Sequence, residues 1–406
     1  MRRIMYINSI CGSGSTGRII TGLMDRLTDM GIETLAAYGR GTAPLEYDTY
    51  RIGTKPGVLL HGGISRLTDR HGLYSTGATR RLIEVIRRFN PDLIHIHNVH
   101  GYYVNYALLF HYLREEFVRI RKKPRLVWTL HDCWAFTGHC THYSYIGCDK
   151  WLTGCDRCPQ KNQYPKSFLG DASEENYRLK KKLFPGIRGL SLVTPSEWLK
   201  TQVEKSFLRD YPISVVPTGI DVSVFQETPS DLRERFGVGN RLLLLGVANP
   251  WRERKGYDDF LRLAEILGDG CRIAMIGLKR RQMKNLPANI IAIGHTDSLT
   301  EMVQWYSCAD IYVNLTLEDT FPTTNLEAMA CGTPVLTYDA GGSGESVTEE
   351  TGKVVACGDL KAVIRAIQEI MQRDREALRL ACRTRALDYT ADRRFRQYIK
   401  EIYGIG

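Results

Sequence analysis

The 406-residue chain contains no long apolar run. None of its hydrophobic stretches reaches the roughly 18 residues that a membrane-spanning helix needs. The amino terminus does not resemble a signal peptide either, because the short run IMYINSI at residues 4–10, after Arg2 and Arg3, is typical of a buried strand. These absences predict a cytoplasmic protein.

Acidic residues are fewer than basic ones, 45 against 55, which gives a formal net charge of +10 at pH 7. This excess favours polyanions or an anionic membrane surface as partners, and we expect peripheral contact with the inner face of an anionic membrane. Repeats and low-complexity tracts are also missing, and 43% of the residues are apolar. A chain of this length and composition predicts two globular domains, each with its own core.

One stretch, LEDTFPTTNLEAMACGTP at residues 317–334, predicts a strand end, a turn and a short helix. Pro322 suits the first helical position because its missing N–H would have no intrahelical partner there. Gly332 is expected to end the helix, and Pro334 prevents it from resuming. The free N–H groups and the positive end of the helix dipole should then face whatever precedes Pro322, which predicts a phosphate site.

Two carboxylates accompany this helix, Asp319 before it and Glu327 inside it. Carboxylates beside a phosphate site suit the binding of hydroxyl groups, with a sugar on one side of a diphosphate and a ribose on the other. An ordinary helix with solvated acids is the alternative.

The segment resembles the acidic motif of glycosyltransferase family 4, whose members are retaining enzymes with the two-domain GT-B architecture. The run EAMACGTPV at residues 327–335 carries the resemblance, together with the acid upstream. The resemblance implies that Glu327 holds the nucleotide ribose and that Asp319 holds the donor sugar. Asp319 stands where the family usually has glutamate, with Glu318 beside it as the alternative, and Pro322 stands where the family usually has glycine.

The basic loop NPWRERK at residues 249–255 opens the second half of the chain. In the family an arginine and a lysine at this place neutralise the donor diphosphate. Lys255 matches the lysine, whereas Asn249 occupies the arginine position, so Arg252 or Arg254 is left to supply the second charge.

In the first half, Gly12, Gly14 and Gly17 have the GxGxxG spacing of a phosphate fingerprint. The strand predicted at residues 35–40 ends in Arg40, where a dinucleotide site would need an acid, so we expect a glycine-rich loop that lines the active-site cleft before a helix at 19–30. The complete predicted donor site draws on this loop, the basic loop and the acidic stretch: Gly14, Asn249, Arg252, Arg254, Lys255, Glu318, Asp319, Phe321, Pro322, Thr323, Thr324 and Glu327.

His131 closes the strand predicted at residues 126–132, at the carboxyl end where open α/β sheets bind ligands. The resemblance places a histidine here beside the donor sugar, so His131, Asp319 and Lys255 are the predicted catalytic residues. His95 and His97, near the end of the segment 90–98, are expected to pack in the core instead.

Residues 133–160 form a cysteine-rich insertion that ordinary family members lack. Cys140, Cys148, Cys155 and Cys158 cluster there, the last two as CxxC. Thiolates at such spacing can close a tetrahedral site in a loop too small for its own core, which predicts a structural zinc. Free buried cysteines are the alternative.

Alternating strands and helices imply parallel sheets. We therefore expect an α/β, GT-B fold with two Rossmann-like domains facing each other across a cleft. Residues 1–218 would form the acceptor-binding domain, residues 219–385 the nucleotide-sugar-binding domain, and residues 386–406 a C-terminal helix that crosses back to the first domain.

The predicted activity is retaining transfer of a hexose from a UDP- or GDP-sugar to an acceptor hydroxyl. Within the family, the motifs GSGSTGR, HDCWAFTGHC and EDTFP resemble bacterial enzymes of capsule, O-antigen or colanic-acid synthesis, which implies a glycan or lipid-linked acceptor. No DxD pair ends a predicted strand in the first half, so we expect no metal or other cofactor to be required for catalysis.

Two other classes remain open. A GT-B sugar-nucleotide epimerase would share the architecture but should need further catalytic acids. A zinc-bearing nucleic-acid-binding protein would explain the charge and the CxxC, but interleaved aromatics on a basic strand are missing, so no nucleic-acid partner is expected.

Overall fold

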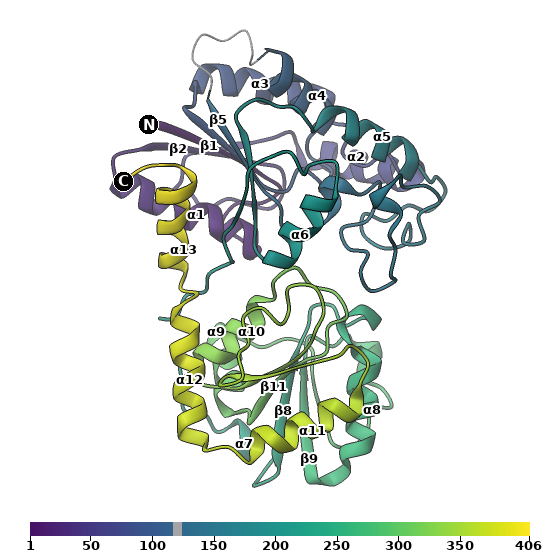
Figure 1. Cartoon of the computed structure of the whole chain (residues 1–406), viewed down its shortest axis with the longest axis vertical. Helices are drawn as coiled ribbons and strands as arrows, with labels where there is room; N and C mark the ends of the chain where they lie inside the picture. Colours follow the sequence, from purple (N-terminus) through teal and green to yellow (C-terminus); the bar gives the residue numbers. More distant parts are fainter. Residues whose placement is uncertain (117–123) are drawn as a thin grey trace. The chain divides into compact units, whose positions relative to one another are not determined.

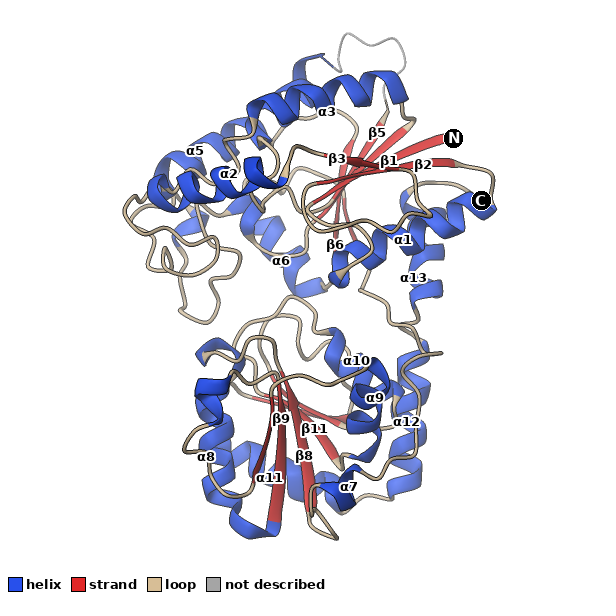
Figure 2. Cartoon of the chain, turned by 180° about the vertical axis from the view of Figure 1, so that it is seen from behind, coloured by secondary structure: helices blue, strands red, loops and turns tan. Residues whose placement is uncertain are grey.

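The structure, a computed structural model, describes residues 1–116 and 124–406. Its contacts divide the chain into two compact units. Unit 1 comprises Met1–Val216 together with Phe395–Gly406, and unit 2 comprises Pro217–Arg394. Figures 1 and 2 show that each unit consists of one twisted sheet with helices packed on both of its faces.

Unit 1 contains a seven-stranded sheet whose paired strands all run parallel. In spatial order its strands are β3 (Thr49–Arg51), β2 (Glu33–Tyr38), β1 (Arg3–Asn8), β4 (Leu93–Ile96), β5 (Arg125–Thr129), β6 (Leu190–Thr194) and β7 (Ile213–Val215). Its helices are α1 (Gly14–Asp29), α2 (Lys55–Thr68), α3 (Thr76–Phe89), α4 (Tyr106–His111), α5 (Ser173–Leu183) and α6 (Glu197–Lys205). Short π- and 3₁₀-helical turns are η1 (Tyr112–Glu116), η3 (Trp134–Phe136) and η4 (Lys150–Leu152).

Two apolar layers cover the faces of this sheet. On one face α1 packs together with the C-terminal segment, and Gly22 lies so close to the Phe395 ring that a Cβ there would come within 2.3 Å of it. On the other face α3, α4 and α6 pack with the first part of the cysteine-rich insertion. Strands buried on both faces explain why β1 and β4 are nearly continuous apolar runs.

Unit 2 contains a six-stranded parallel sheet. In spatial order its strands are β10 (Ile290–Ile293), β9 (Cys271–Ile276), β8 (Leu242–Val247), β11 (Ile311–Asn314), β12 (Val335–Tyr338) and β13 (Gly352–Val355). Its helices are α7 (Leu232–Arg235), α8 (Tyr257–Leu267), α9 (Leu299–Cys308), α10 (Thr323–Ala330), α11 (Leu360–Met371) and α12 (Arg375–Leu387), and α13 (Ala391–Gln397) leads back to unit 1. Short 3₁₀ and π turns are η5 (Glu253–Lys255), η6 (Gly268–Gly270), η7 (Arg280–Met283) and η8 (Tyr398–Ile402).

Both sheets follow the Rossmann strand order, in which the first strand lies at the centre and the chain then builds outward in both directions. This confirms the prediction of two Rossmann-like halves. The order reverses between β1 and β4 in unit 1 and between β8 and β11 in unit 2. Ligands of such sheets bind outside the carboxyl ends of the strands at these two points.

Several predicted elements are confirmed and others are wrong. The short helix predicted in the stretch 317–334 is α10, and the helix predicted within 386–406 is present as α13. The helix predicted at 19–30 begins earlier, at Gly14. The C-terminal helix predicted at 386–406 begins only at Ala391, because Thr390 forms a bridge with Ile220 that separates α12 from α13.

No helix among residues 1–116 and 124–406 is long and apolar enough to cross a membrane.

Candidate active site

The acidic stretch lies at the carboxyl end of β11 and runs into α10. The helix begins at Thr323, so Pro322 is its N-cap residue and not, as predicted, its first helical residue. No side chain caps this helix end, and the N–H groups of the first turn of a helix have no intrahelical acceptor. Gly332, with φ of +81°, follows the last turn as expected.

The basic loop and the acidic stretch are joined by ion pairs. Lys255 Nζ lies 2.6 Å from Asp319 Oδ2, and Arg254 Nη1 lies 3.7 Å from Glu318 Oε1. The backbone reinforces the contact, because the Leu317 N–H donates to the Arg254 carbonyl at 2.9 Å. The structure therefore brings together the predicted diphosphate-binding lysine and the predicted sugar-binding acid.

The two neighbouring acids differ in exposure. The Glu318 side chain is 2% exposed and faces Arg254 in the interior, whereas the Asp319 side chain is 21% exposed. Asp319 Oδ1 also accepts a hydrogen bond from the Phe321 N–H at 3.2 Å. Asp319 is therefore the acid that a ligand in solution can reach.

Two glycines allow this close approach of loops. Gly256 has φ of +73°, and a Cβ at this position would lie 2.1 Å from the Leu315 carbonyl oxygen. Gly341 has φ of +63°, and its Cβ would lie 2.0 Å from the Asp319 carbonyl oxygen. Any side chain at either position would displace the acidic stretch from the basic loop.

Glu327 is held inside the first turns of α10. Its Oε2 accepts a hydrogen bond from the Tyr306 hydroxyl at 2.9 Å, and its Oε1 accepts one from the Thr323 hydroxyl at 3.3 Å. Burial, followed by the nearby Glu327 charge, raises the pKa of Tyr306, so this hydroxyl stays protonated and donates. Sequence reasoning missed Tyr306, because nothing in the α9 sequence indicates which residue of α10 it meets.

The remaining predicted donor residues of unit 2 divide between surface and core. Asn249 and Arg252 are exposed, and Thr324 is partly exposed in the first turn of α10. Phe321 is buried, and its ring centroid lies 5.8 Å from that of Tyr389. The structure thus places the Phe321 side chain in the core, which leaves its backbone as the part that can face a ligand.

Unit 1 presents its predicted residues at the carboxyl ends of β1, β4 and β5. Gly14 is the first residue of α1, with φ of +63°, and it is exposed. The loop before it is fixed by Asn8, whose side-chain amide donates to the Ile10 carbonyl at 2.8 Å and to the Thr16 hydroxyl at 3.1 Å.

His131 follows β5 and is hydrogen-bonded to His97 at the end of β4. His131 Nε2 and His97 Nδ1 lie 2.9 Å apart in rings inclined by 13°. Burial lowers the pKa of His131 to about 4, and the adjacent His100 adds to this against the opposing charge of Asp132. His131 is therefore neutral at pH 7.

The His97 ring decides which nitrogen of His131 carries the proton. His97 Nε2 is buried without a hydrogen-bond partner. A buried N–H without a partner is rarer in proteins than an unsatisfied acceptor, so we assign the His97 proton to Nδ1, which donates to His131 Nε2. His131 then carries its own proton on Nδ1. The prediction that His97 packs in the core omitted this contact.

His95 is a core residue, as predicted. Its two ring nitrogens lie 2.7 Å from the Tyr403 hydroxyl and 2.7 Å from the Thr129 hydroxyl. The ring is fully buried, and burial lowers its pKa to about 3. His95 therefore joins the C-terminal segment to the sheet.

Asp132, next to His131, is paired with His100. Its Oδ2 lies 2.9 Å from His100 Nε2, and its Oδ1 accepts from the Trp134 N–H at 2.9 Å. Burial alone would raise the pKa of Asp132, but His100 and these hydrogen bonds lower it to about 2. The pair fixes the loop that carries His131, and sequence reasoning missed it.

The cysteine-rich insertion follows directly on this loop. The predicted zinc ligands are thiols, of which Cys140 is buried and Cys148, Cys155 and Cys158 are partly exposed. Cys140 and Cys158 are hydrogen-bonded to each other, which raises the pKa of Cys140 and lowers that of Cys158 to about 7. Cys155 Sγ accepts a hydrogen bond from the Gly138 N–H at 3.2 Å.

These thiols suit zinc in their chemistry. Their sulfur atoms do not lie close enough together to bind one ion. Among the described residues, only Asp69, His71 and His139 form a group of three or more metal-binding side chains whose ligand atoms all lie within 4.8 Å of one another. A zinc ion would have to draw the cysteine loop together.

Asp69, at the end of α2, anchors the insertion to the rest of unit 1. Its Oδ1 lies 2.5 Å from His139 Nδ1, and its Oδ2 accepts from the Ala172 N–H at 2.9 Å. The ammonium group of Lys180, buried beside it, donates to the carbonyls of Trp134 and Thr137 at 2.7 and 2.9 Å. Polar contacts therefore hold the insertion in place without zinc.

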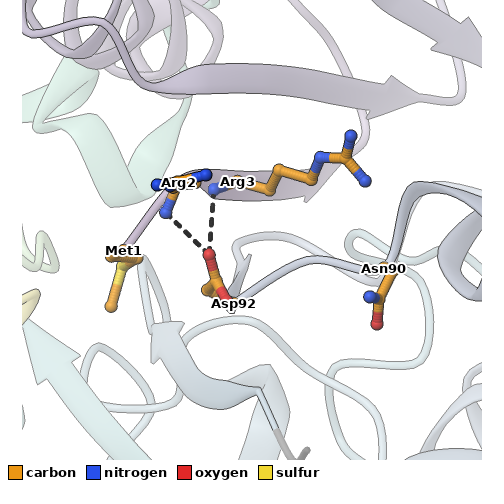
Figure 3. Close-up of a pocket in the computed structure, with 5 residues that line it drawn as sticks. All are labelled: Met1, Arg2, Arg3, Asn90 and Asp92. Carbon is orange, nitrogen blue, oxygen red and sulfur yellow. Dashed lines mark hydrogen bonds between the residues drawn. The ribbon is translucent and has the colours of Figure 1, made fainter.

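A hollow of about 630 Å³ lies elsewhere, at the amino ends of β1 and β4. It is lined by Met1, Arg2, Arg3, Asn90 and Asp92. Figure 3 shows the Asp92 carboxylate accepting hydrogen bonds from the backbone N–H groups of Arg2 and Arg3. The Asp92 carboxylate already accepts hydrogen bonds from the backbone. The hollow lies at the amino ends of the strands, whereas His131 lies at their carboxyl ends.

Comparison with known proteins identifies the class. Sucrose-phosphate synthase of Thermosynechococcus elongatus superposes with a TM-score of 0.71 at 16% identity, over 100% of this chain and 98% of that one. Anabaena HepE in complex with UDP gives a TM-score of 0.67 at 14% identity, over 100% of both chains. Together with the two Rossmann-like sheets, these matches define the fold as GT-B, the class of two-domain glycosyltransferases.

Sequence matches narrow the class to a family. Residues 16–224 match the description Glycosyltransferase Family 4, and residues 239–373 match Glycosyl transferases group 1. The colanic acid biosynthesis glycosyl transferase WcaC of Escherichia coli K12 is 23% identical over 365 residues, 87% of each chain. The lipopolysaccharide core biosynthesis mannosyltransferase LpsB of Rhizobium meliloti is 31% identical over 193 residues, 42% of this chain and 54% of that protein. The chain belongs to glycosyltransferase family 4 and is a glycosyltransferase.

Proposed function

We propose that this enzyme transfers a hexose from a nucleoside-diphosphate sugar to an acceptor hydroxyl and retains the anomeric configuration. The observation that carries the proposal is the contact between Lys255 and Asp319, 2.6 Å apart, beside the uncapped amino end of α10. Three kinds of group meet at the carboxyl edge of a Rossmann sheet, where nucleotides bind. They are a cation that can pair with phosphate, an acid that can accept hydrogen bonds from hydroxyls, and free N–H groups that can bind an anion.

The main task of the protein is electrostatic. As the bond between the anomeric carbon and the leaving phosphate oxygen breaks, the diphosphate gains negative charge. Lys255 stabilises that charge, together with Arg252 or Arg254 and the N–H groups after Pro322. The acceptor oxygen forms the new bond on the face that the diphosphate leaves, and its proton passes to the departing phosphate oxygen.

Donor recognition is divided between three side chains. Glu327, oriented by Tyr306, accepts hydrogen bonds from the ribose hydroxyls. Asp319 accepts from the sugar hydroxyls, and its exposure relative to Glu318 supports this choice between the two acids. His131 contributes a neutral imidazole whose Nδ1–H can donate to a sugar oxygen.

The donor nucleotide is UDP or GDP, and the acceptor is a lipid-linked glycan of a bacterial surface polysaccharide. Anabaena HepE structures contain UDP and UDP-glucose, and the names of WcaC and LpsB refer to colanic acid and lipopolysaccharide core synthesis. A lipid-linked acceptor places the enzyme at the cytoplasmic face of a membrane.

One structural zinc bound by Cys140, Cys148, Cys155 and Cys158 completes the proposal. A closed site of four thiolates leaves no position for water, so the metal would support the loop after His131 and take no part in chemistry.

Release of free UDP or GDP tests the activity. A panel of UDP- and GDP-sugars is incubated with the enzyme, with and without membrane extract that supplies lipid-linked acceptors. We expect release of one nucleotide that depends on the extract and is lost in Asp319→Asn. Conversion of the donor sugar to an epimer without nucleotide release would identify an epimerase instead. The anomeric coupling constant of the product then tests retention.

A further inference from the structure

Helix α2 has its apolar side turned to solvent. Leu59, Leu60 and Leu67 are 75%, 65% and 52% exposed, whereas the residues that the helix buries are His61, Gly62 and Ser65. A surface helix of a globular protein normally presents the opposite pattern, with apolar residues towards the core. Packing within unit 1 therefore does not account for the leucines.

Polar contacts hold α2 in place. The two ring nitrogens of His61 lie 2.7 Å from the Ser75 hydroxyl and 3.2 Å from the Gly72 N–H, which donates to the ring. At the end of the helix the Thr68 hydroxyl lies 2.9 Å from the Tyr74 hydroxyl. Because these bonds fix the polar side of α2 inward, its leucines must face outward.

A neighbouring loop extends the apolar area. The Phe168 N–H donates to the Arg66 carbonyl at 2.6 Å, and the Gly170 N–H donates to the Leu67 carbonyl at 2.9 Å. Phe168 and Leu169, held in this way against the end of α2, are 55% and 75% exposed. These contacts define one surface, which we call the leucine surface: Leu59, Leu60, Leu67, Phe168 and Leu169.

The sequence on the helix side of this surface is basic, whereas the loop carries one exposed acid, Asp171, as well as a basic residue. Between Asp48 and Glu84 the only acidic residue is Asp69, which is buried and paired with His139. Lys55, Arg66 and Arg70 are exposed on or beside α2. On the loop, Lys166 places its ammonium 4.9 Å from the centroid of the Phe168 ring.

Both views of the fold place α2 at the periphery of unit 1 next to α5 (Figures 1 and 2). The Asn176 side chain of α5 donates to the Asp69 carbonyl at 2.7 Å and keeps the two helices together. The leucine surface therefore stands on a fixed support within unit 1.

We propose that the leucine surface inserts into the interfacial region of an anionic lipid bilayer, with Lys55, Arg66, Arg70 and Lys166 on the headgroups. The inference rests on the proposed lipid-linked acceptor and adds the surface by which the enzyme reaches it. Exposed apolar side chains gain from burial among acyl chains, and flanking cations gain from the negative surface potential. The two effects together give stable peripheral binding, which neither gives alone.

Vesicle co-sedimentation of the full chain tests this surface without donor or acceptor. The vesicles consist of phosphatidylcholine alone or of phosphatidylcholine with about one third phosphatidylglycerol. We expect binding to the anionic vesicles only, weakened by added salt. The variant Leu59→Asn, Leu60→Asn, Leu67→Asn should lower the partition coefficient by about tenfold or more.

A matched control changes exposed leucines elsewhere. Leu380 and Leu387 on α12 are 67% and 56% exposed, so Leu380→Asn, Leu387→Asn should leave vesicle binding unchanged. Replacing Arg66, Arg70 and Lys166 by glutamine should weaken binding by roughly fivefold for each charge removed. Circular dichroism melting verifies that all variants remain folded.

Three outcomes would overturn the inference. Unchanged vesicle binding by the α2 variant would assign membrane contact to another surface. Absence of vesicle binding by the parent protein would show that this surface does not bind an anionic membrane. Concentration-dependent dimers that the α2 variant abolishes would show that a second copy covers the leucines. None of these results affects nucleotide release, which tests the transferase separately.

Discussion

At the scale of single residues, two oppositely charged groups of the candidate site are paired with each other. Lys255, the predicted partner of the diphosphate, is paired with Asp319, the predicted partner of the sugar. A nucleotide sugar supplies both an anion for the lysine and hydroxyl donors for the acid, so it can replace the ion pair with two matched contacts. A nucleotide without its sugar offers only the first, so we expect the complete donor to bind more tightly than the nucleotide product.

Lys255→Ala should therefore lower turnover more than it weakens donor binding. The charge on the leaving diphosphate grows towards the transition state, and loss of one such stabilising group typically costs about a hundredfold in kcat. Steady-state kinetics with the preferred donor measure kcat and KM separately. A rise in KM alone would show that the lysine binds donor and transition state equally.

The same series can decide which arginine acts with Lys255. Arg252→Gln and Arg254→Gln are compared as single and double variants. Arg254 also faces the buried Glu318, so its replacement should lower stability as well as turnover, whereas Arg252, exposed at the surface, should affect turnover more than stability. Thermal melting of each variant separates the two effects.

Glu327→Ala should weaken nucleotide binding. A hydrogen bond to a charged group is worth roughly 1.5–3 kcal/mol, which corresponds to a loss of about tenfold to a hundredfold in affinity. Titration calorimetry with UDP and GDP gives the dissociation constants. Tyr306→Phe is the matched control, because it keeps the carboxylate and removes only the bond that orients it. Parent-like affinity in Glu327→Ala would contradict the ribose contact.

At the scale of elements, local signals in the sequence predicted the parts that depend on local chemistry. Pro322 and Gly332 delimit α10, Thr323–Ala330, to within two residues. Helix α2 was not predicted, because a helix is recognised in a sequence by apolar residues that recur on its buried face. The buried residues of α2 are instead His61, Gly62 and Ser65.

Contacts between distant segments could not be predicted in the same way. The hydrogen bonds of Tyr306 to Glu327 and of His97 to His131 join residues on different elements, and their geometry follows from strand order and register. The break after α12 likewise depends on Ile220, far away in sequence. The chemical types at the site were predictable, whereas their orientation was not.

The cysteine-rich insertion gives a prediction at this scale. Protein purified without chelator should contain about one zinc per chain, and its removal should leave the fold of unit 1 intact, because Asp69 and Lys180 anchor the insertion without metal. Elemental analysis and thiol titration before and after chelation provide the measurement. Cys357→Ser, an exposed cysteine of unit 2, is the control. Metal-free protein with four reactive thiols and full activity would contradict a structural zinc.

At the scale of the whole molecule, histidines are distributed unequally. Nine of the ten lie in unit 1, and His295 is the one in unit 2. Burial lowers the pKa of His61 and His131 to about 4 and that of His95 to about 3. The folded state of unit 1 thus keeps these rings neutral at pH values where an unfolded chain would protonate them.

Acid should therefore destabilise unit 1 before unit 2. The unfolded histidines bind protons below about pH 6.5 and the folded ones only near pH 4, so stability is complete above pH 6.5 and falls as the pH drops between these values. Each ring contributes on the order of 3 kcal/mol over the window. Hydrogen exchange at pH 7 and about pH 5, corrected for intrinsic rates, should show loss of protection in unit 1 first.

His61→Gln serves as the control, because it should reduce this pH dependence by the share of one ring while lowering stability at pH 7 through loss of the bonds to Ser75 and Gly72. Equal loss of protection in both units on acidification would show that the buried histidines do not govern the transition.

The last residues of the chain complete its first unit. The Tyr403 hydroxyl bonds to His95, and Arg125 donates to the carbonyls of Ile402 and Tyr403, so the sheet face on which α1 packs is fully covered only when residues 395–406 are present. On the ribosome residues 395–406 are made after the strands of both sheets. Unit 2, made wholly from residues 217–394, has its full sequence first, and part of one apolar face of unit 1 stays uncovered until residues 395–406 are made. We therefore expect unit 2 to complete its packing during synthesis before unit 1, although unit 1 begins earlier in the sequence.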